Sequence, residues 1–168
     1  MQTTRTERTG FTLFEVLIVV AILLILAGMA VPAFQDTVDD ARATSTRQEL
    51  QRVRTAIDYY SFQHQEQLPG WNGGSWDEVT LRNQLLMASD LGGITAAPGT
   101  SGYAYGPYLT EGVPANPYND LESILIIAPG GSMATANDST GWVYFAADGS
   151  FRANSTAVTP GGDPVFGL

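Results

Sequence analysis

The sequence contains no cysteine and no lysine among its 168 residues, and a single histidine, His64. Without cysteine, disulfide bonds, thiolate metal sites and cysteine catalysis are excluded. Without lysine, Schiff-base chemistry and a phosphate-binding P-loop are excluded as well. His64 has no second histidine with which to build a metal site, and no clear catalytic partners, so we expect a solvated side chain. The sequence therefore gives no sign of an enzyme.

Positive charge is also scarce, because eight arginines face 17 acidic residues and the formal net charge is −9. A nucleic-acid-binding protein needs a cationic surface that replaces the counterions of the phosphate backbone. We therefore expect no nucleic-acid partner. The acid excess is concentrated in residues 68–168, which are also rich in glycine and proline.

A long apolar segment covers residues 11–34, and Glu15 is its one charged residue. A helix of about 20 residues spans a bilayer core, so this segment is long enough. Arg5 and Arg8 precede it, which predicts a cytoplasmic N-terminus and an extracytoplasmic remainder. A cleaved secretory signal ending near Ala30 and a plain single-span anchor are two interpretations. Neither explains a carboxylate inside the apolar segment, which is costly and calls for a partner.

The residues from Gly10 to Val16 read GFTLFEV and lead into the apolar run. This pattern resembles the cleavage and methylation motif of type IV prepilins and of the pseudopilins of type II secretion. The resemblance implies that prepilin peptidase cuts between Gly10 and Phe11 and N-methylates Phe11. It also implies assembly roles for Glu15, which would pair with the N-terminal amine of a neighbouring subunit, and for Pro32, where the helix would kink.

The resulting architecture is α+β and pilin-like, with a cleaved leader (1–10), a transmembrane helix (11–34), an amphipathic stem helix (35–67) and a globular head (68–168). We expect one continuous helix from about Thr12 to Gln63, packed on a small antiparallel sheet. The expected elements of the head are a short helix over 77–90 that begins in a capping box formed by Ser75 and Glu78, and strands at 123–128, 141–147 and 150–153. The apolar stripe of the stem consists of Leu50, Val53, Ile57 and Tyr60.

The head resembles that of the major pseudopilin, the type II secretion protein G, in its loop over 106–117 and in its last hairpin. The resemblance implies a structural subunit that passes once through the inner membrane and has its head in the periplasm. Its implied partners are copies of itself, other pseudopilins, the prepilin peptidase and the inner-membrane assembly platform. Two alternatives stay open: a type IV pilin or minor pilin for adhesion, motility or DNA uptake, and a membrane-anchored extracytoplasmic ligand-binding module.

Calcium is the one cofactor that the resemblance suggests, because heads of this family often bind it near the final strands. Calcium takes six to eight oxygen ligands from carboxylates and carbonyls. Four acidic residues of the head are the candidates, and the other interpretation is that they are solvated loop acids. They are Asp120, Glu122, Asp138 and Asp148.

Processing at the predicted position is open to a direct measurement. We expect intact-mass analysis of the chain from its native host to show the loss of residues 1–10 and the gain of one methyl group at Phe11. An unprocessed N-terminus, or cleavage near Ala30, would contradict the prepilin interpretation.

Overall fold

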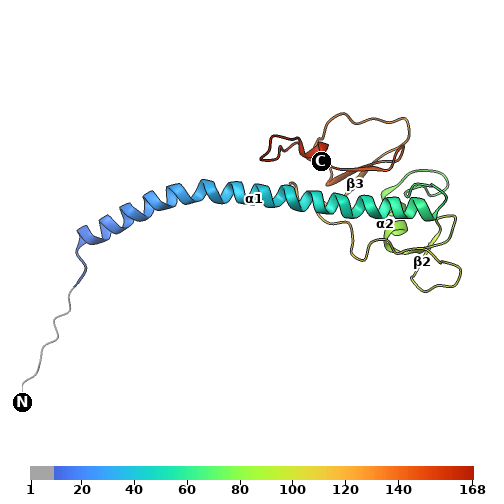
Figure 1. Ribbon diagram of the computed structural model, residues 1–168, viewed down its shortest axis with the longest axis horizontal. Helices are drawn as coiled ribbons and strands as arrows, with labels where there is room; N and C mark the ends of the chain where they lie inside the picture. Colours follow the sequence, from blue (N-terminus) through green and yellow to red (C-terminus); the bar gives the residue numbers. More distant parts are fainter. Residues whose placement is uncertain (1–9) are drawn as a thin grey trace, which may run out of the picture. The chain divides into compact units, whose positions relative to one another are not determined.

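The computed structural model describes residues 10–168, except for the side chains of residues 30–36. It contains the elements α1 (Leu13–Gln63), α2 (Glu78–Leu86), β1 (Ala88–Ser89), β2 (Thr95–Ala96), β3 (Ile124–Ile127), β4 (Trp142–Phe145), β5 (Ser150–Ala153) and the 3-10 turn η1 (Val165–Gly167) (Figure 1). The chain divides into two compact units, one ending at Val38 and one covering Asp39–Leu168. We call the second the globular unit, and it includes the outer part of α1. Residues 1–9 of the predicted leader lie outside the described residues.

Helix α1 has nearly the predicted bounds, because no glycine or proline interrupts the chain between residues 33 and 67. It ends in a Schellman motif, in which the N–H of Glu66 donates to the carbonyl of Ser61 at 2.8 Å. Gln65 and Glu66 both have left-handed backbones, with φ of 57° and 64°. This conformation costs a residue with a side chain about 1–2 kcal/mol. The end of α1 is therefore held by the structure around it.

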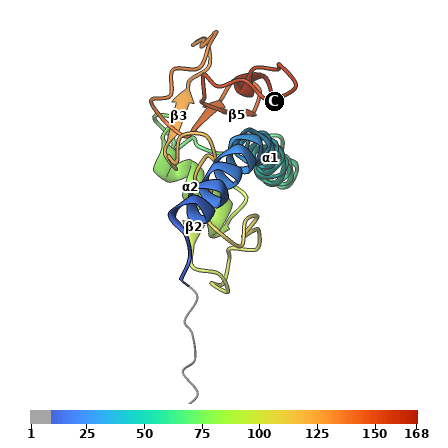
Figure 2. The same ribbon diagram turned by 90° about the vertical axis from the view of Figure 1, so that its left-hand side faces the viewer.

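The stripe predicted on the stem forms the centre of the core. Leu50, Val53, Ile57 and Tyr60 are each at most 2% exposed, and they join one cluster with Trp142 and other side chains of the sheet. Burying an apolar side chain of this size contributes about 1.5–3 kcal/mol. The sheet and α2 both lie beside the outer part of α1 (Figures 1 and 2). Side chains of both join this cluster, so both elements depend on the buried stripe.

The α+β class is confirmed, but the sheet is not purely antiparallel. In the strand order β3-β4-β5, the pair β4–β5 is antiparallel as expected, whereas β3 and β4 are parallel. A parallel pair needs a connection of a dozen or more residues. Residues 128–141 provide it, and they return the chain to the end of the sheet at which β3 began. A second, two-stranded sheet of β1 and β2 was not predicted.

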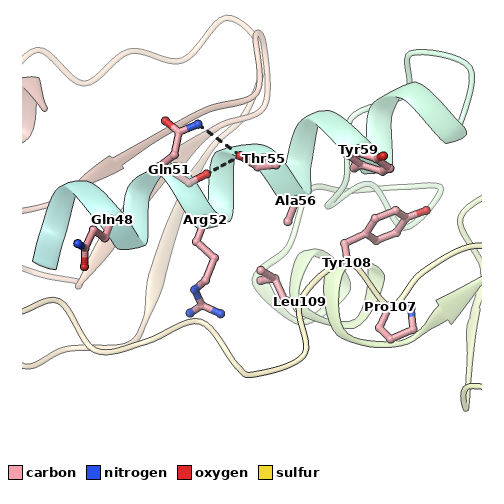
Figure 3. A pocket seen from close by; sticks show the side chains of 9 residues that line it. All are labelled: Gln48, Gln51, Arg52, Thr55, Ala56, Tyr59, Pro107, Tyr108 and Leu109. Carbon is pink, nitrogen blue, oxygen red and sulfur yellow. Dashed lines mark hydrogen bonds between the residues drawn. The ribbon is translucent and has the colours of Figure 1, made fainter.

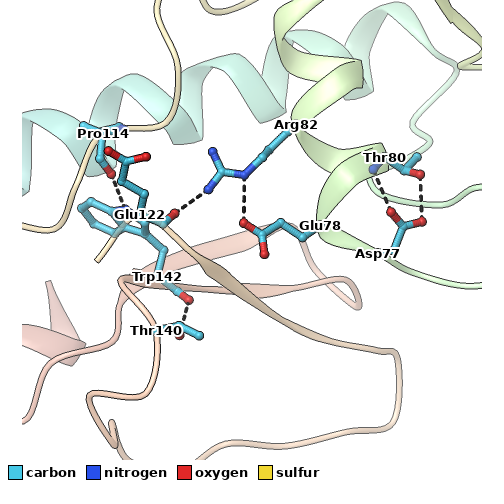
Figure 4. A network of polar contacts seen from close by, with 8 residues as sticks. All are labelled: Asp77, Glu78, Thr80, Arg82, Pro114, Glu122, Thr140 and Trp142. Atoms are coloured by element: carbon cyan, nitrogen blue, oxygen red, sulfur yellow. Dashed lines mark hydrogen bonds and ion pairs between the residues drawn. The ribbon is translucent and has the colours of Figure 1, made fainter. Parts of the chain in front are cut away.

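The short helix of the head begins with a different cap from the one expected. Asp77, rather than Ser75, is the N-cap of α2, and its carboxylate accepts from the N–H of Thr80 at 2.8 Å (Figure 4). The Thr80 hydroxyl donates to the same carboxylate. The helix also ends earlier than the predicted residue 90, because Met87 is extended and the chain continues into β1.

Arg82 connects α2 to the segment that precedes β3. Its guanidinium forms an ion pair with Glu78 at 2.8 Å and donates to the carbonyl of Glu122 at 2.5 Å (Figure 4). Nearby, the indole N–H of the fully buried Trp142 donates to the carbonyl of Pro114 at 2.8 Å. These bonds to backbone carbonyls fix loops that have few apolar side chains of their own.

The Asp77 cap generates a prediction about stability. We expect Asp77→Ala to lower the free energy of unfolding of the full chain by about 0.5–2 kcal/mol at pH 7, because the N–H of Thr80 loses its partner. The measurement is urea unfolding in detergent, followed by tryptophan fluorescence.

This effect should depend on pH. The hydrogen bonds from the Thr80 N–H and hydroxyl hold the pKa of the Asp77 carboxyl below its usual range. The charged cap therefore stabilises the fold above the unfolded-state pKa of about 3.9, and this contribution is lost as the pH falls through the lower folded-state value. Asp77→Asn is the control, since its amide still caps but does not titrate. A stability of Asp77→Ala equal to that of the parent chain would refute the role of this cap.

Candidate functional site

The predicted cleavage site lies in an irregular, exposed segment just before α1. Gly10, Phe11 and Thr12 have no regular secondary structure, and Phe11 is 83% exposed. Such a segment can adopt the extended shape that a peptidase needs, because no helical hydrogen bonds have to break first. The described geometry is therefore compatible with processing between Gly10 and Phe11.

Glu15 forms a capping box with Thr12 at the start of α1. The Glu15 carboxylate accepts from the backbone N–H and from the hydroxyl of Thr12, both at 2.8 Å. In return, the N–H of Glu15 donates to the Thr12 hydroxyl at 3.3 Å. The carboxylate also lies at the positive end of the helix dipole, which favours a negative charge there. In the single chain, Glu15 thus has local partners.

Sequence reasoning missed this role of Thr12, although the signal was present. Thr12 and Glu15 have the spacing of a capping box, T-x-x-E, directly before an apolar helical run. The pairing of Glu15 with the amine of another subunit stays a prediction. Pro32 lies within the bounds of α1, but its side chain is outside the described residues, so the predicted kink is also untested.

The first part of α1 exposes an apolar surface on every side. All side chains from residue 11 to residue 29 are exposed, and among them only Thr12 and Glu15 are polar. A contiguous apolar surface of this extent marks a contact with protein or lipid. No helix within the described residues has an apolar stretch that meets the length and hydropathy needed to cross a membrane.

His64 is buried rather than solvated, which corrects the expectation. Its ring stacks on Tyr60 at 3.9 Å, and Nδ1 lies 2.8 Å from the carbonyl of Tyr60. Nε2 lies 3.0 Å from the Ser89 hydroxyl and 2.9 Å from the Asp90 carbonyl. His64 therefore joins the end of α1 to β1, and its role is structural.

The four acidic calcium candidates have different local surroundings. The Asp138 carboxylate accepts from the N–H and the hydroxyl of Thr156, and the Asp148 carboxylate accepts from the N–H of Ser150 at 2.9 Å. The Glu122 carbonyl accepts from Arg82, and Asp120 has a left-handed backbone with φ of 56°. Among the residues described, no three acidic or histidine side chains are grouped so that they could hold a metal ion.

A groove runs beside α1, between the helix and the loop that holds Pro107 and Tyr108 (Figure 3). Its floor includes the buried side chains of Ala56 and Leu109. Arg52, the charged residue of the lining, already forms an ion pair with Glu49 at 2.8 Å. The groove is therefore suited to contact with another surface rather than to chemistry. Its lining consists of Gln48, Gln51, Arg52, Thr55, Ala56, Tyr59, Pro107, Tyr108 and Leu109.

Comparison with known proteins places this N-terminal segment in a family. Residues 5–31 match the family described as "Prokaryotic N-terminal methylation motif". The chain is 34% identical to fimbrial protein Q of Moraxella bovis over 54% of its own length and 62% of that protein. It is 38% identical to type II secretion system core protein G of Pseudomonas aeruginosa over 33% of its own length and 39% of that protein. No solved structure matches.

With its methylation motif, its long first helix and its α+β fold, the chain is similar to the prepilin-like family of type IV pilins and type II secretion pseudopilins. Members of this family are processed by prepilin peptidase and assemble into filaments. They are structural proteins and not enzymes. The matches cover less than two thirds of each of these two relatives, and the one with protein G is limited to 56 residues.

The capping box can be tested apart from assembly. We expect Thr12→Ala to speed amide hydrogen exchange in the first turn of α1 about 2- to 30-fold, since the loss of a cap costs about 0.5–2 kcal/mol. Thr12→Ser keeps the hydroxyl and serves as the control. Unchanged exchange at Glu15 in the detergent-solubilised Thr12→Ala chain would show that the box does not hold this helix end.

Proposed function

We propose that this chain is a structural subunit of a type II secretion pseudopilus. Prepilin peptidase removes residues 1–10 and N-methylates Phe11, and the subunit then assembles through its N-terminal helix into a filament that drives protein export. The observation that carries the proposal is the exposed apolar surface of residues 11–29 with Glu15 at its beginning. Such a surface is stable only when lipid or other helices cover it.

Before assembly, the lipid of the inner membrane would cover this apolar surface. The apolar segment of the sequence covers residues 11–34, and Arg5 and Arg8 precede it. By the positive-inside rule the N-terminus would stay in the cytoplasm and the globular unit would lie in the periplasm. The subunit would therefore be a single-pass protein until the assembly platform extracts it.

In the filament, Glu15 would exchange one set of partners for another. In the single chain it accepts two hydrogen bonds from Thr12. Among helices packed side by side, water no longer screens the carboxylate, and an ammonium group offsets the cost of burying it. The amine that cleavage creates at Phe11 of a neighbouring subunit is such a group. Correct register would satisfy Glu15, whereas other registers would leave a buried charge unpaired.

A type IV pilin is the second candidate, and one observation favours it. The match with the Moraxella bovis fimbrial protein Q covers 98 residues, whereas the match with secretion protein G covers 56. The absence of cysteine favours the pseudopilin, because many type IV pilins close a C-terminal loop with a disulfide that this chain cannot form. Deletion of the gene separates the two functions: loss of exoprotein secretion supports the pseudopilin, and loss of surface pili with intact secretion supports the pilin.

The role of Glu15 predicts the behaviour of two variants. We expect Glu15→Val to insert into the membrane normally and to form no filaments, because the register contact is lost. Glu15→Gln is the sharper variant, since glutamine can preserve the capping box but carries no charge. If charge pairing drives assembly, Glu15→Gln also fails; if capping alone matters, it assembles. Filament yield by electron microscopy, together with membrane fractionation, gives the answer. Normal filaments from Glu15→Val would contradict any assembly role.

A further inference from the structure

A second groove lies just beyond the end of α1, and two tryptophans form part of its wall. It has a volume of about 580 Å³ and is lined by Glu66, Gln67, Leu68, Trp71, Trp76 and Ala146. We call it the tryptophan groove. Glu66 and Gln67 are its polar lining residues, and the rest of the lining is aromatic or aliphatic. The groove belongs entirely to the globular unit and has no part in the processing site.

The two tryptophans are positioned by a short hairpin. Trp71 and Trp76 form an antiparallel bridge, and their ring centroids are 5.5 Å apart with an interplanar angle of 53°. Gly70 lies against the Trp76 ring and has a φ of 109°, a backbone conformation that glycine adopts without strain. Trp71 is 45% exposed. An aromatic face is therefore fixed in place but open to a ligand.

Glu66 provides an acidic group on the same groove. The Schellman motif at the end of α1, with its left-handed backbone at Glu66, fixes the position of the Glu66 Cβ atom. The side chain of Glu66 has no hydrogen bond or ion pair with any described residue, and the residue is exposed. A carboxylate beside tryptophan faces is an arrangement that attracts a cation, above all a planar guanidinium, which can stack and form an ion pair together.

The chain offers one described arginine for such a contact. Five of the six arginines from residue 42 onward already have partners. Arg42 pairs with Asp39, Arg52 with Glu49, Arg82 with Glu78, Arg54 donates to the carbonyls of Phe151 and Leu168, and Arg152 lies over the rings of Phe145 and Phe166. Arg47 is exposed on α1, and none of the described residues accepts a hydrogen bond from it or forms an ion pair with it.

Arg47 cannot reach the tryptophan groove of its own chain. Arg47 lies 16 positions before Gln63, which corresponds to about 24 Å along α1, and the groove begins beyond that helix end. This distance far exceeds the reach of an arginine side chain. A second copy that is displaced along the helix direction by about 25 Å would, in contrast, bring its Arg47 level with the groove.

We propose that the tryptophan groove of one subunit receives Arg47 of a second copy of this chain. The guanidinium stacks on the tryptophan faces and forms an ion pair with Glu66, which links successive globular units along the filament. The interaction rests on the proposed filament function and specifies one contact in it. Arg47 is exposed, has no ion pair with the described residues and carries the charge opposite to that of Glu66, and these observations point to a copy of this chain as the partner.

Because the chain has no cysteine of its own, introduced cysteines are its only thiols in a cross-linking test. Filaments of the Arg47→Cys, Glu66→Cys double variant are treated with a short thiol-to-thiol cross-linker, and covalent dimers and longer ladders are expected on a denaturing gel. The control is Arg42→Cys with Glu66→Cys, because residue 42 lies about 7.5 Å further along α1 and on another face. Filaments that form normally but give no 47–66 dimers overturn this contact and leave the filament function intact. If the parent chain forms no filaments in its host, the filament function itself fails.

Charge reversal provides the second measurement and decides the question if the cysteine pair does not assemble. We expect Arg47→Glu and Glu66→Arg each to reduce filament yield about 5- to 30-fold, and the double reversal to restore it. Glu111→Arg makes the same change of charge at an exposed acid whose side chain lacks a described partner, and should leave the yield unchanged. Unaltered far-UV circular dichroism confirms that each variant folds. Full assembly of either single variant, or no rescue by the double reversal, overturns the proposal.

Discussion

The globular unit depends on the burial of one face of α1. Leu50, Val53, Ile57 and Tyr60 make that face, and their burial holds a three-stranded sheet whose strands are only four residues long. Strands of this length form no stable sheet by themselves, because their few hydrogen bonds and contacts do not repay the loss of chain entropy. The helix is therefore the scaffold of the unit as well as the connection to the N-terminal segment.

The outer and inner parts of α1 are both helical but differ in how their apolar side chains are distributed. The outer part has one apolar stripe and finds its partner inside the chain. The inner part is apolar on all sides and finds none among the described residues of its own unit. Assembly into a filament would give that part its partners, so that the chain becomes fully buried only among its copies. Under the proposed function, the single charge at Glu15 would have a large effect, because it would be a charged group that helix packing has to accommodate.

Most arginines act inside the globular unit. Arg54 and Arg82 donate to backbone carbonyls, and Arg152 lies over the rings of Phe145 and Phe166. A chain with eight arginines and no lysine has few cations left for contacts with other molecules. Arg47 and the Glu66 carboxylate of the tryptophan groove are therefore notable, because neither has a hydrogen bond or an ion pair among the residues that the structure describes.

The sequence alone determined the long helix, its buried stripe, the α+β class and the prepilin-type motif. All of these follow from local spacing: helical periodicity, the absence of glycine and proline over 33–67, and the residues from Gly10 to Val16. Tertiary structure decided what depends on distant residues. It placed β3 parallel to β4 through a 14-residue connection, buried His64 against β1, and made Asp77 the cap of α2. It also brought Glu66 beside Trp71 and Trp76. Sequence reasoning could not foresee these contacts, because the energy of each comes from groups that folding, rather than chain spacing, brings together.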